Sequence, residues 1–338
     1  MRLKLQVHKF SLLLLSVVTL MIACQEKEYM IPNPVSQLSN DAIKRSLGPN
    51  IVGFLPMEFA YAMALPRTQG KLVSAQVEAS IAGATGTFLE HRSFYTNGAG
   101  FDVPVVVGSP SVNKGNLTSV TFNVDTNAAT LRYYYVVPEE ARGKAVSFTF
   151  SGTSSDGKTV SYKMGPYNIS KMDIKRTLAV TNNTNAYISI EDMAVYNATN
   201  AATNASKIDL VYLYRAAPAA FTHALVSPAA GAQYLPGVTL PADINRSTKL
   251  RKVFGVPDFN LVRSFGSYTS STASGNYIDD LDFQEIDLSS SPNFAVGMRA
   301  ESGVWAETAD GKYRAFIFVN TVNNNGSAVI SMLRYVLK

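Results

Sequence analysis

Cysteine, tryptophan and histidine are scarce in this 338-residue sequence, which holds one cysteine, one tryptophan and three histidines. A single cysteine excludes an intrachain disulfide, a cysteine-based zinc cluster and a dithiol redox pair. Charged residues make up only 16% of the chain, whereas hydrophobic residues make up 46%. This composition excludes wholesale disorder, and the length allows two domains of about 150 residues each.

A strong excess of one charge is also missing. The formal net charge is +5, but Arg2, Lys4 and Lys9 lie in a leader segment that we expect to be cleaved off. The mature chain then has 27 basic and 25 acidic residues, which gives a net charge of +2. This charge leaves no electrostatic footprint for nucleic acid, so we expect no nucleic-acid partner.

The leader combines these basic residues with an apolar run at residues 10–22, which is too short for a stable membrane span. Residues 1–23 are therefore predicted to be a signal peptide. Residues 20–24 resemble a bacterial lipobox, in which a small residue precedes a cysteine, although Met21 stands where such signals prefer leucine. The resemblance implies that Cys24 is lipidated and that its acyl chains attach the protein to a membrane.

Acidic residues follow the predicted anchor directly, at Glu26 and Glu28. This pattern resembles the export signal of Bacteroidetes lipoproteins that are moved to the cell surface. It implies an outer-membrane protein that faces the extracellular side. Residues 24–49 are rich in Pro, Asn, Ser and Gln, so we expect a lipidated tether with one or two helical turns at residues 41–47.

Apolar residues recur at every second position in much of the remaining chain. Residues 146–150 and 160–164 alternate in this way around the turn residues Asp156 and Gly157, which predicts a β-hairpin. Further predicted strands, including a second hairpin around the turn at residues 309–312, are residues 70–79, 101–107, 119–124, 130–137, 186–190, 207–214, 304–308, 313–320 and 327–336.

Many short strands with no long amphipathic helix predict an all-β chain. One short helix is expected at residues 197–205, where alanines favour helix. Polar residues at positions 181–185 separate two sets of strands. We expect an immunoglobulin-like β-sandwich at residues 50–172, followed by a larger β-sandwich or jelly roll at residues 173–338.

Five segments carry a family resemblance, and they are residues 130–144, 172–176, 187–193, 207–215 and 305–315. Together they look like an uncharacterised family of two-domain Bacteroidetes surface lipoproteins, a domain of unknown function, and the resemblance covers nearly the whole mature chain. The layout is similar to that of the accessory glycan-binding lipoproteins of starch-utilisation-type systems. The resemblance implies a β-rich, lipid-anchored surface protein, and it assigns no activity to any residue.

Catalytic motifs are missing from the sequence. His91 and His223 are isolated from candidate nucleophiles, and neither a Gly-x-Ser-x-Gly elbow nor a phosphate-binding glycine loop with a following lysine occurs. We therefore expect no enzymatic activity and no catalytic residue. An unrecognised glycoside hydrolase is the remaining enzymatic alternative.

Acidic residues cluster in one segment, and they are Asp279, Asp280, Asp282, Glu285 and Asp287. Carboxylates at alternating positions suit Ca²⁺, the one candidate cofactor, and the candidate ligands are Asp279, Asp280 and Asp282. Two carboxylates at the right separation would also suit glycoside hydrolysis. The interpretation that we favour is a solvated strand edge whose apolar residues face the core.

Aromatic residues supply the other candidate site. In a strand, Tyr134 faces opposite to Tyr133 and Tyr135, so at least one of these rings is expected to reach solvent. Trp305 precedes a predicted turn, and exposed rings of this kind stack on sugar faces. Arg314 is a candidate donor to acidic sugars, and core packing is the alternative for each ring.

Surface anchoring, two sandwiches and abundant tyrosine together predict a noncatalytic, surface-exposed lipoprotein that binds glycans or other extracellular polymers. The alternative is an adhesin or surface-assembly component that meets a protein partner through an exposed strand edge.

Overall fold

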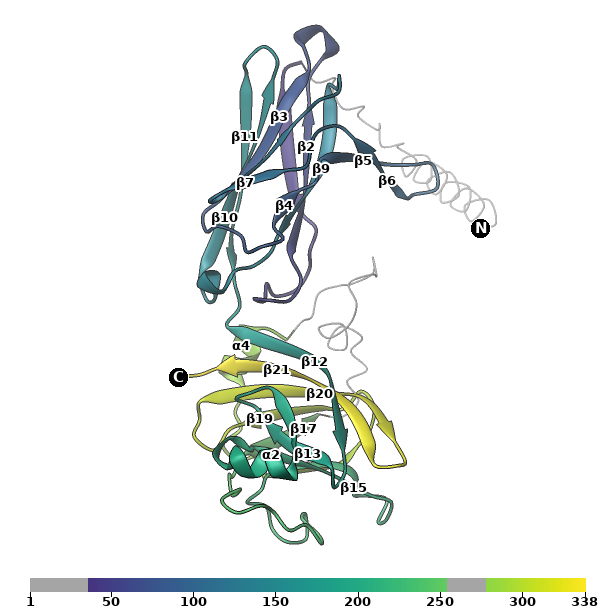
Figure 1. Ribbon diagram of the computed structural model, residues 1–338, viewed down its shortest axis with the longest axis vertical. Helices are drawn as coiled ribbons and strands as arrows, with labels where there is room; N and C mark the ends of the chain where they lie inside the picture. Colours follow the sequence, from purple (N-terminus) through teal and green to yellow (C-terminus); the bar gives the residue numbers. More distant parts are fainter. Residues whose placement is uncertain (1–35, 254–277) are drawn as a thin grey trace, which may run out of the picture. The chain divides into compact units, whose positions relative to one another are not determined.

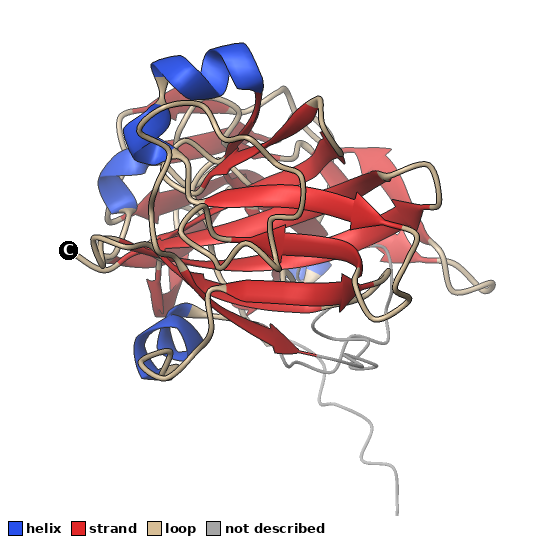
Figure 2. Ribbon diagram, turned by 90° about the horizontal axis from the view of Figure 1, so that it is seen from below, coloured by secondary structure: helices blue, strands red, loops and turns tan. Residues whose placement is uncertain are grey.

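The computed structural model describes residues 36–253 and 278–338. Antiparallel strands make up about half of this part of the chain, and helices make up little of it (Figures 1 and 2). The all-β prediction, with two successive β-sandwich domains, is confirmed. In the described ranges, no helix is long and apolar enough to cross a membrane.

The first domain is a sandwich of two sheets. Its elements are β1 (Ser39–Lys44), β2 (Met57–Ala64), η1 (Arg67–Gln69), β3 (Leu72–Ala79), β4 (Phe88–Leu89), β5 (Arg92–Thr96), β6 (Asp102–Val106), β7 (Val112–Lys114), β8 (Leu117–Thr121), β9 (Ala128–Tyr135), η2 (Glu139–Ala141), β10 (Ala145–Ser154) and β11 (Thr159–Asn168). One sheet has the strand order β1-β2-β9-β4, and the other has the order β11-β10-β3-β8-β7.

Alternating side chains build the core between these two sheets. Strand β2 buries every second residue, from Met57 to Met63, and turns three alanines outward. Rings from both sheets meet in the middle, where Phe59 lies 4.8 Å from Phe148 and 5.5 Å from Phe150 between centroids. Burial of this much apolar surface is the main favourable contribution to the folding free energy of such a sandwich.

Strands β5 and β6 pair only with each other and form a hairpin outside both sheets. Figure 1 shows this hairpin standing away from the rest of the first domain. It carries exposed apolar side chains, which are Tyr95, Phe101, Val105 and Val106.

The second domain is also built on two sheets. Its elements are β12 (Met172–Thr181), β13 (Asn185–Ser189), β14 (Ala194–Asn197), α2 (Ala198–Thr203), η3 (Ala205–Lys207), β15 (Leu210–Arg215), β16 (Thr222–Val226), β17 (Lys249–Val253), α4 (Asp280–Glu285), β18 (Phe294–Met298), β19 (Gly303–Glu307), β20 (Tyr313–Asn323) and β21 (Ser327–Val336). The strand orders are β12-β21-β20-β19-β17 and β14-β13-β15-β16-β18.

Three apolar clusters stabilise this domain. One lies between the two sheets and includes Ile188, Leu210 and Ile317. A second covers the outer side of the β13-β15-β16 strands with residues from α2 and from the loop after β16. The third joins Phe283 of α4 to Phe316 and Tyr335 on the opposite sheet. The domain therefore buries apolar residues on both outer faces as well as in the middle.

Most predicted strands are present, and the helix expected near residues 197–205 is observed as α2 with Asn197 as its N-cap. Two local predictions are wrong. The segment expected to form helical turns contains β1, because its backbone pairs with β2 from Ser39 to Lys44. The acidic segment expected as a strand edge forms helix α4, because Asp279 and Asp282 make a reciprocal capping box.

Candidate functional site

The tyrosine run of β9 divides between the core and the outer face. Tyr133 and Tyr135 are buried, and burial raises the pKa of both phenols. Tyr134 faces the other way, half-buried, and stacks on the exposed ring of Phe88 with centroids 4.8 Å apart. Of the three predicted tyrosines, only Tyr134 is placed where a ligand could reach it.

Trp305 and Arg314 are engaged in packing contacts of the second domain. Trp305 is half-buried, with its ring centroid 5.1 Å from Phe283 and 4.9 Å from Phe316. Arg314 Nε lies 2.9 Å from a carboxylate oxygen of Glu307, and its guanidinium also donates to the carbonyl of Phe283. Both residues therefore hold α4 against the sheet, rather than lining a binding surface.

The three candidate calcium ligands form hydrogen bonds within the protein. Asp279 accepts from the backbone N–H groups of Leu281 and Asp282, and Asp282 accepts from the N–H of Asp279. Asp280 accepts from the Ser170 hydroxyl and from the Lys171 N–H. Across the described residues, no group of three or more His, Cys, Asp or Glu side chains is arranged to hold a metal ion.

The other predicted residues do not form a site either. Cys24 lies outside the described residues, so the lipidation prediction stays a prediction. His223 is buried beside Tyr212, with its Nδ1 2.6 Å from the phenol oxygen, and His91 lies beside Glu90 in the first domain. The structure does not bring these two histidines together.

A groove runs between the β5–β6 hairpin and the outer face of the β1-β2-β9-β4 sheet, with a volume of about 450 Å³. The residues that line this hairpin groove are Ser39, Asn40, Asp41, Ala62, Met63, Ala64, Ser93, Phe94, Tyr95, Ala128, Ala129 and Thr130. Tyr95 is 55% exposed and contributes an aromatic ring to the lining.

Small side chains keep the groove open. In the register of the sheet, Ala62 lies between Asp41 of β1 and Thr130 of β9, and Ala64 lies between Ser39 and Ala128. Solvent-facing positions of an antiparallel strand usually carry polar residues with longer side chains. Alanine at these positions instead leaves room for a flat ligand to approach the backbone.

An ionic and aromatic contact fixes the hairpin beside the groove. Arg132 of β9 is buried, and its guanidinium pairs with Asp102 of β6 at 2.5 Å. The same guanidinium lies 5.2 Å from the centroid of the Phe94 ring on β5. Arg132 is buried and Asp102 is partly exposed, and a charge-assisted hydrogen bond between them is stronger than a neutral one, so this contact helps to hold the hairpin in position.

Polar groups in the groove are oriented by their own hydrogen bonds. The Ser93 hydroxyl accepts from the Thr130 N–H at 2.9 Å, and its own hydrogen is free to donate to a ligand. The Asp41 carboxylate is exposed and accepts from the Ala42 N–H. The groove thus offers a ring, a small-residue floor and oriented polar groups.

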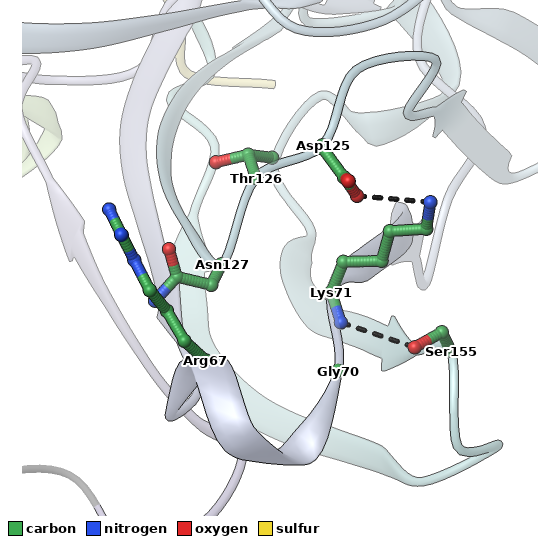
Figure 3. A pocket seen from close by; sticks show the side chains of 7 residues that line it. All are labelled: Arg67, Gly70, Lys71, Asp125, Thr126, Asn127 and Ser155. Carbon is green, nitrogen blue, oxygen red and sulfur yellow. Dashed lines mark hydrogen bonds and ion pairs between the residues drawn. The ribbon is translucent and has the colours of Figure 1, made fainter.

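A second, more polar pocket lies at the end of the same domain (Figure 3). The residues that line this arginine pocket are Arg67, Gly70, Lys71, Asp125, Thr126, Asn127 and Ser155. Figure 3 shows Arg67 and Asn127 on one side and the Lys71–Asp125 ion pair, 3.0 Å long, on the other.

Sequence reasoning missed both depressions. The strand at residues 101–107 was predicted, but its partner β5 was not, so the projecting hairpin could not be anticipated. The available signal lies in β2, where Ala60, Ala62 and Ala64 occupy three of the four outward positions of an alternating strand. An outward row of alanines indicates a surface kept clear of long side chains.

Two sequence families cover the described domains. Residues 35–169 match DUF4466, a domain of unknown function, and residues 170–337 match DUF8576, a second domain of unknown function. No curated protein matches the chain. The family border falls at residues 169 and 170, and the sequence-based border was set at residues 172 and 173.

Solved structures extend this comparison. The crystal structure of a DUF4466 family protein from Parabacteroides merdae is 47% identical, with a TM-score of 0.80, and the match covers 90% of this chain and 100% of that chain. The major pilin GBS80 of Streptococcus agalactiae is 11% identical, with a TM-score of 0.26, over 45% of this chain and 67% of that chain. The collagen-binding subdomain of the Enterococcus faecalis surface protein ACE is 10% identical, with a TM-score of 0.20, over 36% of this chain and 96% of that chain.

Parabacteroides belongs to the Bacteroidetes, the group of bacteria that the sequence resemblance indicated. The relative from this genus is matched over its whole length and shares nearly half of its residues with the chain. The protein therefore belongs to the DUF4466 family.

Proposed function

We propose that this protein is a noncatalytic lipoprotein of the outer membrane that binds extracellular glycans in the hairpin groove. The observation that carries the proposal is the exposed Tyr95 ring beside the alanine floor of β2. An aromatic ring binds the apolar face of a sugar by stacking, and its area supplies much of the affinity. Lipidation at Cys24 would hold this domain at the extracellular side of the membrane.

The groove has the dimensions and chemistry of a small-ligand site. Its volume of about 450 Å³ lies within the range of about 300–1,000 Å³ that is usual for ligand pockets. Ser93 and Asp41 place hydrogen-bonding groups around it, which sugar hydroxyls need. Such groups orient a sugar, while the ring and the alanines contact its carbon atoms.

The test is a comparison of two tyrosine variants of the full mature chain in detergent micelles. Glycan arrays identify bound sugars, and calorimetry measures their affinity for the wild type, for Tyr95→Ala and for Tyr162→Ala. Tyr162 is 37% exposed on β11, away from the groove lining, and serves as the matched control. We expect Tyr95→Ala to weaken binding about 5- to 150-fold, since stacking on one ring contributes about 1–3 kcal/mol.

A wild-type protein that binds no glycan, or two tyrosine variants with equal affinity, would contradict this proposal. A protein ligand is the second candidate, because the hairpin also exposes Phe101, Val105 and Val106 at 70%, 49% and 54%. Apolar side chains in this number on one projecting element suit a protein surface. Phe101→Ser would then reduce capture of the partner while leaving glycan binding intact.

A further inference from the structure

The arginine pocket adjoins the hairpin groove through consecutive residues of the chain. Ala128 lines the groove, and Asn127, its neighbour, lines the pocket. On the adjacent strand, Ala64 lines the groove and Arg67 lies three residues further on, in η1. A chain-like ligand that leaves the groove at Ala64 and Ala128 therefore reaches the pocket next.

Backbone contacts tie the walls of the pocket together. The Lys71 N–H donates to the Ser155 hydroxyl at 3.1 Å, and the Ser155 N–H donates to the Lys71 carbonyl at 2.8 Å. Gly70 makes this approach feasible, because a Cβ atom there would lie 2.4 Å from the Ser155 oxygen. Asn127 donates from its amide to the Leu65 carbonyl at 3.0 Å, which orients its side-chain oxygen.

The charges of the pocket leave one cation without a counter-charge. Lys71 pairs with Asp125, and their side chains are 54% and 82% exposed, so this pair is weak and easily replaced. Within residues 36–253 and 278–338, no carboxylate lies within ion-pair distance of Arg67. The groove itself carries the exposed carboxylate of Asp41, which disfavours an anion there.

We infer that the arginine pocket binds the carboxylate of an acidic sugar residue whose neighbouring sugar occupies the hairpin groove. Arg67 presents a planar guanidinium that matches a carboxylate with two parallel hydrogen bonds. Lys71 supplies a second positive charge from the opposite side, and Asn127 accepts from a sugar hydroxyl. This inference rests on the proposed function, since it names the chemical class of the glycan: a uronic-acid-containing polysaccharide.

The test uses matched pairs of ligands that differ only in charge. Oligosaccharides from polygalacturonate, alginate and hyaluronan are compared with the same oligosaccharides after reduction of their carboxyl groups. For the wild type in detergent micelles, we expect at least one acidic form to bind about tenfold more tightly than its reduced form, with an affinity that falls as salt is raised.

Variants of Arg67 test whether the arginine pocket causes the difference in affinity between the acidic and reduced forms. Arg67→Ala is expected to lower the affinity for the acidic form to that of the reduced form and to remove most of the salt dependence. Arg67→Lys keeps the positive charge but loses the planar guanidinium. Its affinity for the acidic form should lie between those of the wild type and Arg67→Ala. Arg176→Ala removes an exposed arginine of β12 in the other domain and should behave like the wild type.

The outcomes separate this inference from the proposed function. The acidic-sugar assignment is overturned if the wild type binds the acidic and reduced forms with equal affinity. It is also overturned if Arg67→Ala lowers the affinity for both forms by the same factor. If Tyr95→Ala still weakens binding of the reduced forms in that case, the proposed function stands alone. A wild type that binds none of these oligosaccharides, while it binds neutral glycans on an array, also overturns the assignment. A wild type that binds no glycan at all overturns both.

Discussion

Trp305 contributes to stability through two ring contacts that join α4 to the β19–β20 strands. Replacement by alanine would leave a cavity between Phe283 and Phe316. Removal of a fully buried tryptophan costs about 3–5 kcal/mol, and the partial exposure of Trp305 reduces this to about 2–4 kcal/mol. We expect Trp305→Ala to lower the urea midpoint accordingly, with no change in glycan affinity. If Trp305→Ala keeps wild-type stability but loses glycan binding, Trp305 is a ligand-binding residue instead.

His223 makes the stability of the second domain depend on pH. The side chain is buried, its Nδ1 shares a hydrogen bond with the Tyr212 hydroxyl, and burial lowers the pKa of His223. The unfolded chain takes up a proton near pH 6.5, whereas the folded chain takes it up only at lower pH. The contribution of the neutral ring to stability is therefore complete above pH 6.5 and is lost as the pH falls below it.

We expect the free energy of unfolding to decrease between pH 7 and pH 5 by up to about 1.4 kcal/mol per pH unit from this group. His223→Gln should flatten that part of the curve, although it also lowers stability at pH 7 because the Tyr212 contact changes. Urea titrations at each pH measure the curves of the wild type and of His223→Gln, and parallel curves for the two proteins would contradict the assignment.

The environment of a side chain was predictable where its neighbours are close in sequence. Alternation placed Tyr134 opposite to Tyr133 and Tyr135, because successive residues of a strand face opposite sides. It could not place Trp305, since the ring that covers it comes from Phe283, about twenty residues earlier and on a separate element. Contacts with residues distant in sequence determine whether a side chain is buried, and the local sequence pattern does not reveal those contacts.

At the scale of the element, the β5–β6 hairpin exposes an edge that a proline protects. The Val107 N–H donates to the His91 carbonyl and the Asn97 N–H donates to the Phe101 carbonyl. Because hydrogen-bonded pairs alternate along an antiparallel ladder, residues 102, 104 and 106 of β6 direct their backbone groups away from β5. Pro104 occupies the middle of these positions and has no N–H to donate.

We expect Pro104→Val to create a strand edge that pairs with a second copy of the chain. The variant should form dimers as its concentration rises, because it restores a donor and a strand-favouring residue at the outward position. Sedimentation velocity measures the change in mass. Pro110→Val, at an exposed position outside the strands, should keep the mass of the wild type at each concentration. A monomeric Pro104→Val protein at every concentration would show that the edge is protected by another feature.

Local turn chemistry explains which elements were predictable. The β10–β11 hairpin and the β19–β20 turn combine apolar strand segments with Asp-Gly pairs, and both are observed. Helix α4 was missed although its capping box is visible in the sequence, because the segment was interpreted as a solvated strand edge whose apolar residues face the core. Strand β1 was missed because it buries only Ala42, so pairing with β2, rather than its own pattern, decides its conformation.

At the scale of the whole molecule, the all-β class was predictable because period two recurs in both domains, and each domain needs two sheets to bury its apolar faces. The hairpin groove was not predictable from the chain, because it is assembled from β1, β2, β5 and β9. Of these strands, β1 comes first after the predicted anchor. The 14 residues between Cys24 and Ser39 span at most about 50 Å when extended, which bounds the distance from the lipid to the groove domain.

Under the proposed lipidation and glycan binding, the anchor would contribute to binding, because many copies held near one surface engage a polymer together and gain avidity. We expect Cys24→Ala to abolish palmitate labelling and to move the protein from the detergent phase to the aqueous phase. Its affinity for a short oligosaccharide should stay unchanged, whereas cells that express it should no longer retain the corresponding polymer at their surface. Phase partition, metabolic labelling and a polymer-retention assay measure these three quantities on one variant. Label retained by Cys24→Ala would end the lipoprotein assignment, and polymer retained without the lipid would show that another segment holds the protein at the surface.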